Sequence, residues 1–173
     1  MASDHVPVSE RIEAALRANA AYADSFARSG LPVAPAGRLA VVACMDARID
    51  VAQMLGLDLG DAHVIRNAGG IVTDDVLRSL IASHHLGGTE GVIVVNHTKC
   101  AVLTSREDLE ARLSAETGVE PGIPVRVEVS PDPGENVRAQ MSRVRSHPWI
   151  PGSVVVRGFV YDVDTGRLDE VDA

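Results

Sequence analysis

Residues 38–45 read RLAVVACM, an apolar run with one charged residue at its start. An unbroken run of this kind predicts a β-strand covered on both faces, because a strand with one face in water alternates apolar and polar residues. A similar run occupies residues 91–95, and residues 62–66 predict a further strand. Predicted helices at 51–55 and 73–87 separate these strands. The sequence therefore predicts an α/β fold with a mostly parallel central sheet, flanked by helices on both faces.

The rest of the chain continues this alternation. Before the first strand we expect a helix that is capped by Ser9 and runs to about residue 28, within an N-terminal helical arm over residues 1–35. Beyond the third strand, the patterns predict helices at 106–116 and 135–145 and strands at 125–129, 153–162 and 168–171. With 173 residues and no internal repeat, the chain is expected to form a single domain over residues 1–173.

The composition argues against several classes of partner. The net charge of −8 disfavours DNA, RNA and anionic membranes, since clustered Lys and Arg bind phosphate groups. No apolar run approaches the roughly 18 residues of a membrane span, and the first residues lack the basic and apolar segments of a secretory signal. Two cysteines do not resemble a secreted disulfide framework, so a cytoplasmic location is expected.

Both cysteines follow predicted buried strands. Cys44 ends the first apolar run, and His97-x-x-Cys100 follows the run at 91–95. Because the carboxyl ends of parallel strands meet at one edge of a sheet, we expect these three side chains to lie together. Two thiolates and one imidazole form a ligand set for Zn²⁺ that leaves a fourth position for water, as in catalytic zinc sites.

The same residues allow two other interpretations. Buried free cysteines are common, so Cys44 could be a core residue beside a surface ion pair of Asp46 and Arg48. A disulfide between Cys44 and Cys100 is the other interpretation, and a reducing compartment disfavours it. The spacing His-x-x-Cys alone is a weak signal, because a strand end can contain it by chance.

Three motifs in order are more specific than each motif alone. The sequence CMDAR at residues 44–48 is followed by VIRNAG at residues 64–69, and then by the apolar run that ends in His-x-x-Cys. In order and spacing, from residue 38 to about residue 162, the chain resembles the β-class carbonic anhydrases. The resemblance implies a sheet of the predicted kind, with the N-terminal helix packed on a partner subunit of a homodimer or homotetramer.

The resemblance also implies a role for individual residues. It implies a Zn²⁺ cofactor held by Cys44, His97 and Cys100. It implies catalytic roles for Asp46 and Arg48: the carboxylate either pairs with the guanidinium and leaves the zinc open to water, or binds the zinc as a fourth ligand and closes the site. A loop is expected to shape the cleft for a small-molecule substrate, and its residues are Arg66, Asn67, Ala68, Gly69 and Val72.

The activity that the resemblance implies is the reversible hydration of CO₂ to bicarbonate by zinc-bound hydroxide. The nearest rival is hydrolysis of carbonyl sulfide or carbon disulfide, since some members of this fold family act on those molecules. A non-catalytic zinc or bicarbonate-sensing module is a third possibility, and the intact pair of Asp46 and Arg48 argues against it.

Three residues beside the expected metal site depart from the family pattern, which keeps the sulfur substrates open. Asn96 precedes the ligand histidine, where His or Gly is common. Lys99 is expected to point into solvent, as buried lysines are rare. Ala101 takes the place of a usual glycine, and a left-handed φ at this position would strain alanine. We instead expect Ala101 to begin a helix, where alanine is favourable.

Overall fold

The structure of the protein, a computed structural model, describes residues 6–102, 106–120 and 130–172. The chain divides into two compact units, Met1–Leu31 and Pro32–Ala173. Whether the two units form one domain stays a prediction, and the predicted strand at 125–129 lies outside the described residues. Within the described parts of the chain, no helix is both long enough and apolar enough to cross a membrane.

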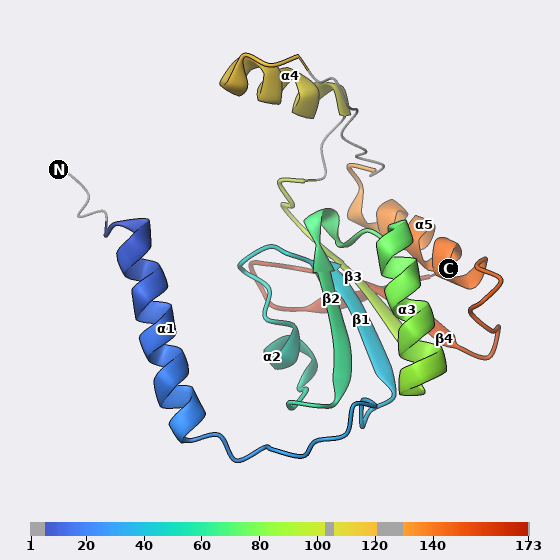
Figure 1. The fold of residues 1–173 in the computed structure, drawn as a ribbon. Helices are drawn as coiled ribbons and strands as arrows, with labels where there is room; N and C mark the ends of the chain where they lie inside the picture. Colours follow the sequence, from blue (N-terminus) through green and yellow to red (C-terminus); the bar gives the residue numbers. More distant parts are fainter. Residues whose placement is uncertain (1–5, 103–105, 121–129, 173) are drawn as a thin grey trace. The chain divides into compact units, whose positions relative to one another are not determined.

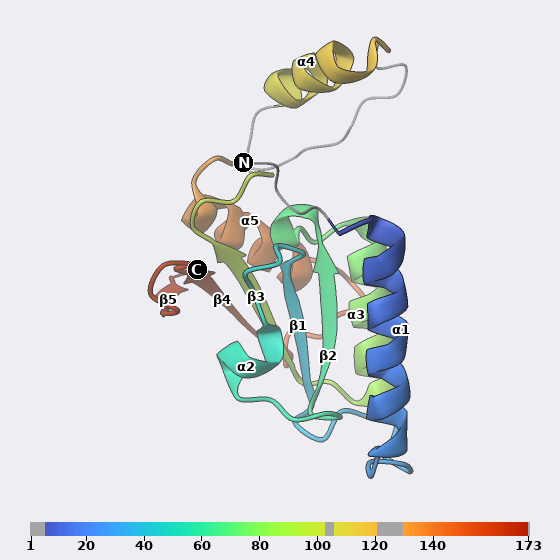
Figure 2. The same cartoon turned by 90° about the vertical axis from the view of Figure 1, so that its left-hand side faces the viewer.

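The second unit is built on a five-stranded sheet with the order β2-β1-β3-β4-β5. Figure 1 labels the first four strands of this order, and Figure 2 labels all five. The first four of these strands are parallel, and β5 pairs antiparallel with β4. The strands are β1, Leu39–Cys44; β2, Ala62–Asn67; β3, Gly91–His97; β4, Val155–Tyr161; and β5, Leu168–Val171. The predicted mostly parallel sheet is confirmed, and the ends of these strands lie within two residues of their predicted positions.

Two hydrophobic clusters cover the two faces of the sheet. Helices α3, Asp74–Gly87, and α5, Pro133–Arg145, pack on one face, and the short α2, Val51–Leu55, packs on the other (Figure 2). Alternate residues of β1 point to opposite clusters: Ala40 and Val42 to the first, Val41 and Ala43 to the second. The unbroken apolar run at 38–45 is explained by this burial on both faces.

Local signals determine where α3 and α5 begin and end. The Thr73 hydroxyl accepts a backbone N–H of the first turn of α3 at 3.3 Å, and Gly88 ends that helix in the left-handed conformation, with φ of 69°. Helix α5 begins two residues before its predicted start. The Asp132 carboxylate accepts the Glu135 N–H at 2.7 Å, and Pro133 suits the first helical position because its missing N–H has no partner there.

Helix α1, Val8–Asp24, begins earlier than predicted, and the predicted cap at Ser9 is wrong. Its N-cap is Pro7, whose φ of −53° and ψ of 144° make it the last extended residue before the helix. The helix ends at Asp24 rather than near residue 28. None of its residues is buried, and Ile12 and Leu16 are 56% and 59% exposed. Packing of this helix on a partner subunit stays a prediction.

Helix α4, Arg106–Thr117, agrees with its predicted position to one residue.

The order of the strands indicates where a ligand would bind. Strand β2 lies on one side of β1, whereas β3 and β4 follow on the other side. The connection from β1 to β2 and the connection from β3 to β4 therefore leave the sheet in opposite directions. Ligands of parallel sheets bind at such a switch point, outside the carboxyl ends of the strands. Cys44, Asn67 and His97 are the last residues of β1, β2 and β3.

Candidate active site

Two thiols and one imidazole meet at the carboxyl ends of β1 and β3. The Sγ atoms of Cys44 and Cys100 lie 3.8 Å apart, and the ligand atoms of Cys44, Cys100 and His97 all lie within 4.8 Å of one another. Cys44 and His97 are each only 1% exposed. Both cysteines are free, so the disulfide interpretation is wrong. The sequence prediction that these three residues lie together is confirmed.

The imidazole of His97 has a lone pair available for a metal. Its Nδ1 lies 2.9 Å from the Thr98 carbonyl oxygen. A carbonyl only accepts, so Nδ1 carries the proton and Nε2 carries the lone pair. Among the described residues, Nε2 of His97 is a buried side-chain nitrogen with no hydrogen-bond partner. A metal ion bonded to Nε2 and to both sulfurs would satisfy it, and this sulfur–nitrogen donor set is one that Zn²⁺ prefers.

The environment of Cys44 favours its thiolate form, which is the form that binds metals. The contact with Cys100 is the largest of the effects that lower the pKa of Cys44 to about 5. Burial acts in the opposite direction, and the backbone of Asp46 and Gly69 lowers the pKa further.

Asp46 is held beside this cluster by Arg48. The guanidinium grips the carboxylate at two points, with Nε donating to Oδ1 at 2.9 Å and Nη2 donating to Oδ2 at 2.7 Å. Arg48 itself is anchored by the Lys99 carbonyl oxygen, 3.0 Å from Nη2. This hydrogen-bonded pairing holds the pKa of Asp46 well below its usual range. Oδ2 of Asp46 lies 3.8 Å from Nε2 of His97, so an ionised carboxylate borders the cluster.

Of the two arrangements that the resemblance implies for Asp46, the structure contains the one in which it pairs with Arg48. The pairing depends on residues far apart in the sequence, because Lys99 follows β3 whereas Arg48 follows β1. A sequence pattern does not reveal which of the two arrangements the chain adopts.

The predicted cleft loop lies against the end of β1. Arg66 donates to the carbonyl oxygens of Cys44 and Asp46, at 3.0 and 2.7 Å, and so fixes the backbone that carries both side chains. The Asn67 side chain donates to the Ile71 carbonyl at 2.7 Å and accepts the Ile71 N–H at 2.8 Å. These hydrogen bonds close residues 67–71 into a compact turn.

The other predicted cleft residues differ in exposure. Ala68 is exposed, whereas Gly69 is buried with φ of 82°. Val72 is 0% exposed and belongs to the core cluster under α3 and α5, so its side chain supports the loop from beneath. Contact of any of these residues with a substrate stays a prediction.

The three departures from the family pattern take different structural roles. Asn96 is buried and donates to the carbonyl oxygen of Gly69 at 3.1 Å. Lys99 points into solvent as predicted, with 63% of its side chain exposed and its Nζ 2.5 Å from Asp164. Lys99 itself has a left-handed backbone conformation, with φ of 54°. Ala101 lies in an exposed turn instead of beginning a helix, so that prediction is wrong.

Sequence reasoning missed two buried amides on α5. Asn136 and Gln140 are 1% and 5% exposed and lie one helical turn apart. The signal was present, because both border the apolar stripe of Val137, Met141 and Val144 on that helix. Besides each other, their partners are Val72 and Asn96, which lie outside α5, so their purpose becomes visible only in the folded chain.

Comparison with known proteins agrees with this geometry. Residues 39–168 match the family model for carbonic anhydrase. Over 154 residues the chain is 46% identical to β-carbonic anhydrase 1 of Mycobacterium tuberculosis, and the match covers 88% of this chain and 93% of that protein. The chain belongs to the β-carbonic anhydrase family.

Solved structures place the fold in the same family. The crystal structure of a carbonic anhydrase from Streptococcus mutans superposes with a TM-score of 0.87 at 40% identity, covering 93% of this chain and 97% of that one. The chain is also similar to a carbon disulfide hydrolase of Acidithiobacillus thiooxidans, with 35% identity over 150 residues, 76% of this chain and 75% of that protein. The present chain is thus an enzyme of the carbonic anhydrase type.

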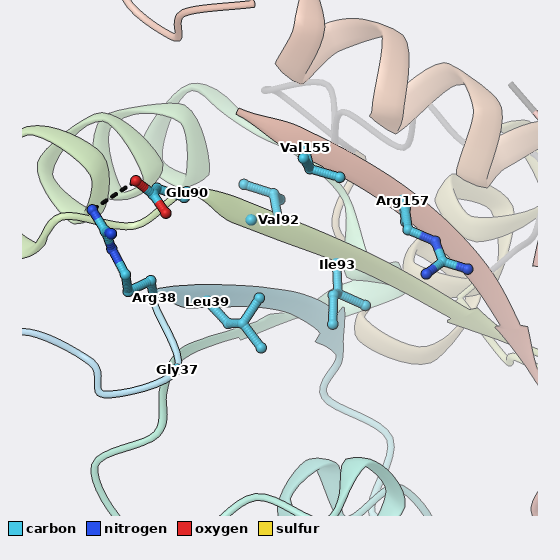
Figure 3. Close-up of a pocket in the computed structure, with 9 residues that line it drawn as sticks. Gly37, Arg38, Leu39, Glu90, Val92, Ile93, Val155 and Arg157 are labelled. Atoms are coloured by element: carbon cyan, nitrogen blue, oxygen red, sulfur yellow. Dashed lines mark ion pairs between the residues drawn. The ribbon is translucent and has the colours of Figure 1, made fainter. Parts of the chain in front are cut away.

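A groove of about 370 Å³ lies at the opposite end of the sheet (Figure 3). Its floor includes Leu39 and Val155, the first residues of β1 and β4, and it is bordered by the ion pair of Arg38 and Glu90, 2.7 Å apart. Arg157, which also lines it, pairs with a glutamate of β5. Since the metal-ligand residues lie at the carboxyl ends of the strands, this groove is separate from the candidate active site.

Proposed function

We propose that the protein is a Zn²⁺-dependent enzyme that interconverts CO₂ and bicarbonate. The observation that carries the proposal is the convergence of the Cys44 and Cys100 sulfurs on the unpartnered Nε2 of His97, with the carboxylate of Asp46 beside them. The 46% identity to a β-carbonic anhydrase over most of the chain supports it.

In this proposal Cys44, His97 and Cys100 hold the ion. Bound Zn²⁺ acidifies a coordinated water and so supplies a nucleophile near neutral pH. The lowered pKa of Cys44 favours its metal-binding form at neutral pH. The hydrogen bond from Nδ1 of His97 to the Thr98 carbonyl fixes the ring so that Nε2 faces the sulfurs.

Asp46 serves as a hydrogen-bond acceptor in the reaction. Its depressed pKa keeps it ionised at neutral pH, so it accepts and does not donate. From its position beside His97 it orients the proton of the attacking oxygen away from the substrate, and a lone pair then faces the carbon. Arg48 supports this role by binding both carboxylate oxygens, which keeps Asp46 from becoming a metal ligand.

The cleft matches a small, uncharged substrate. CO₂ offers no hydrogen-bond donor, and the exposed methyl group of Ala68 provides an apolar wall at the loop. Arg66 uses its guanidinium to bind two backbone carbonyls and holds the loop that carries Cys44 and Asp46. We propose that Arg66, Asn67, Ala68, Gly69 and Val72 together determine the shape of the cleft.

Metal analysis and stopped-flow CO₂ hydration test the proposal. Asp46→Ala is expected to retain Zn²⁺ but to lose turnover by about 100-fold or more, as expected for a group that directs a proton. The matched control is Asp75→Ala, since Asp75 also pairs with an arginine, at 2.7 Å, but lies on the exposed start of α3. A purified protein without metal, or an Asp46→Ala variant with unchanged turnover, would refute the assignment.

A second candidate substrate is carbonyl sulfide or carbon disulfide. The observation that favours it is the 35% identity to a carbon disulfide hydrolase across three quarters of the chain. The same ligands and the same Asp46 would act on the analogous carbon, with sulfide as the product. Sulfide release and CO₂ hydration, measured on one preparation, separate the two substrates.

We also propose that the protein is a cytoplasmic homodimer or homotetramer in which α1 packs on a partner subunit. The support is that α1 carries Ile12, Leu16 and other apolar residues of which none is buried. Sedimentation of the full chain, compared with an Ile12→Glu, Leu16→Glu variant, tests this. An unchanged mass for the variant would show that α1 does not form the interface.

A further inference from the structure

A continuous chain of three buried side-chain amides connects helix α5 to the loop at the metal-ligand cluster. The three residues, which we call the amide relay, are Asn96 on β3 and Asn136 and Gln140 on α5, with exposures of 1%, 1% and 5%. Burying an amide without its hydrogen bonds costs free energy, so each of these side chains must find its partners inside the protein.

Every hydrogen bond of the relay points in the same direction. The Val72 N–H donates to Oε1 of Gln140 at 2.8 Å. Nε2 of Gln140 donates to Oδ1 of Asn136 at 3.0 Å, and Nδ2 of Asn136 donates to Oδ1 of Asn96. Finally, Nδ2 of Asn96 donates to the carbonyl oxygens of Gly69 and Gly70, at 3.1 and 3.4 Å.

The ends of the relay determine the orientation of each amide. A backbone N–H, here that of Val72, can only donate, and the carbonyls of Gly69 and Gly70 can only accept. Turning any one amide over would place two donors or two acceptors against each other. Because amides do not titrate, this arrangement is also independent of pH.

Both ends of the relay form hydrogen bonds with the same short segment, residues 69–72. The same loop also lies against the backbone of Cys44, one of the three candidate metal ligands. Gly70 lies so close that a Cβ added to it would be 2.9 Å from the backbone nitrogen of Cys44. The carbonyl oxygen of Asn67 accepts the backbone N–H of Met45, the residue after Cys44, at 2.9 Å. A shift of the segment would therefore displace the backbone that carries Cys44.

We propose that Asn96, Asn136 and Gln140 are positioning residues that hold segment 69–72 against the backbone of Cys44, and that they thereby set the affinity of the site for its metal. The inference rests on the proposed function only in taking Zn²⁺ as the ion. Groups that orient and hydrogen-bond metal ligands from outside the coordination shell change metal affinity by about 10- to 100-fold when mutated.

Two variants interrupt the relay with little change of shape. In Gln140→Glu an ionised carboxylate can accept the Val72 N–H but has no proton for Oδ1 of Asn136. Gln140→Met, the second variant, removes both hydrogen bonds while keeping a flexible side chain of similar length. The matched control is Val137→Ala, on the same helix and 0% exposed, which removes core packing but no hydrogen bond of the relay.

The test measures Zn²⁺ affinity by competition with a chelator, the absorption of the Co²⁺-substituted protein, and thermal unfolding of each full-length variant. We expect both Gln140 variants to bind Zn²⁺ about 10- to 100-fold more weakly and to shift the sulfur-to-cobalt absorption bands. Val137→Ala should bind Zn²⁺ within about twofold of the wild type, even though its core-packing loss lowers its melting temperature.

Two outcomes would overturn the inference. One is a pair of Gln140 variants that unfold at lower temperature yet keep the wild-type Zn²⁺ affinity and Co²⁺ spectrum, because the relay would then be purely structural. The other is an equal loss of affinity in Val137→Ala. If the protein hydrated no CO₂, the proposed function would fail, but these metal-binding measurements would still test the relay.

Discussion

Gly70 offers a quantitative test of how closely the cleft loop approaches the metal ligands. Its φ is 62°, in the left-handed region, and a Cβ added there would be 2.9 Å from the Cys44 nitrogen, 2.9 Å from the Val95 carbonyl oxygen and 3.0 Å from Nδ2 of Asn96. Two of these neighbours are backbone atoms that cannot rotate away, so Gly70→Ala must displace the loop or β1.

The expected cost has two parts. A left-handed φ costs an L-residue about 1–2 kcal/mol, and overpacking a filled interior costs about 1–3 kcal/mol. We therefore expect Gly70→Ala to lower the free energy of unfolding by about 2–5 kcal/mol. Gly56→Ala is the matched control: its φ is 64°, but nothing lies within 4 Å of the added Cβ. It should lose only the conformational part, about 1–2 kcal/mol.

Urea denaturation of the two variants and the wild type, with and without a chelator, measures both costs. Gly70→Ala should also weaken Zn²⁺ binding, because the added Cβ would press on the backbone nitrogen of Cys44, a proposed ligand. Equal losses of stability in Gly70→Ala and Gly56→Ala would refute the close approach of the loop to β1.

Three further predictions follow from the site and the fold. Arg48 lowers the pKa of Asp46 in the folded state, so the ionised carboxylate stabilises the fold above its unfolded pKa of about 4, and this stabilisation is lost as the pH falls toward the lower folded pKa. The difference in unfolding free energy between the wild type and Asp46→Asn, measured in urea, should therefore decrease from pH 7 to pH 3. A difference that stays constant would contradict the pairing. Asp50→Ala removes the cap of α2, where the carboxylate accepts the Gln53 N–H at 3.1 Å, and should cost about 1 kcal/mol in the same assay, with Asp50→Asn close to wild type. Two thiolates offset the charge of Zn²⁺, so bound water should be less acidic than at a three-histidine site. The rate of CO₂ hydration should therefore rise from about pH 7 to pH 9, and a flat stopped-flow profile over this range would argue against the ligand set.

Much of the scaffold was predictable from local pattern. The apolar run at 38–45 could only be a strand covered on both faces, and alternation with helices made the sheet parallel. Parallel strands bring their carboxyl ends to one edge, so the last residues of β1 and β3 had to be neighbours in space. This is why the sequence alone groups Cys44, His97 and Cys100, which the structure brings together.

Boundaries and departures were less predictable, because several local signals compete. Ser9 is a good cap residue, but Pro7 comes first and has the backbone conformation that precedes a helix. Ala101 favours a helix, but the left-handed turn at Lys99 and the Lys99 carbonyl that anchors Arg48 give this segment a different course.

The sequence by itself determined the fold class and grouped Cys44, His97 and Cys100 as a candidate metal site, since these follow from periodicity and from short motifs. Only the tertiary structure decided that the Lys99 carbonyl anchors Arg48, that Val72 lies in the core, and that Asn136 and Gln140 bond to Asn96 and Val72. The physical reason is that these features depend on hydrogen bonds between groups up to 68 residues apart. Burial makes those bonds obligatory, and the fold alone determines which donor meets which acceptor.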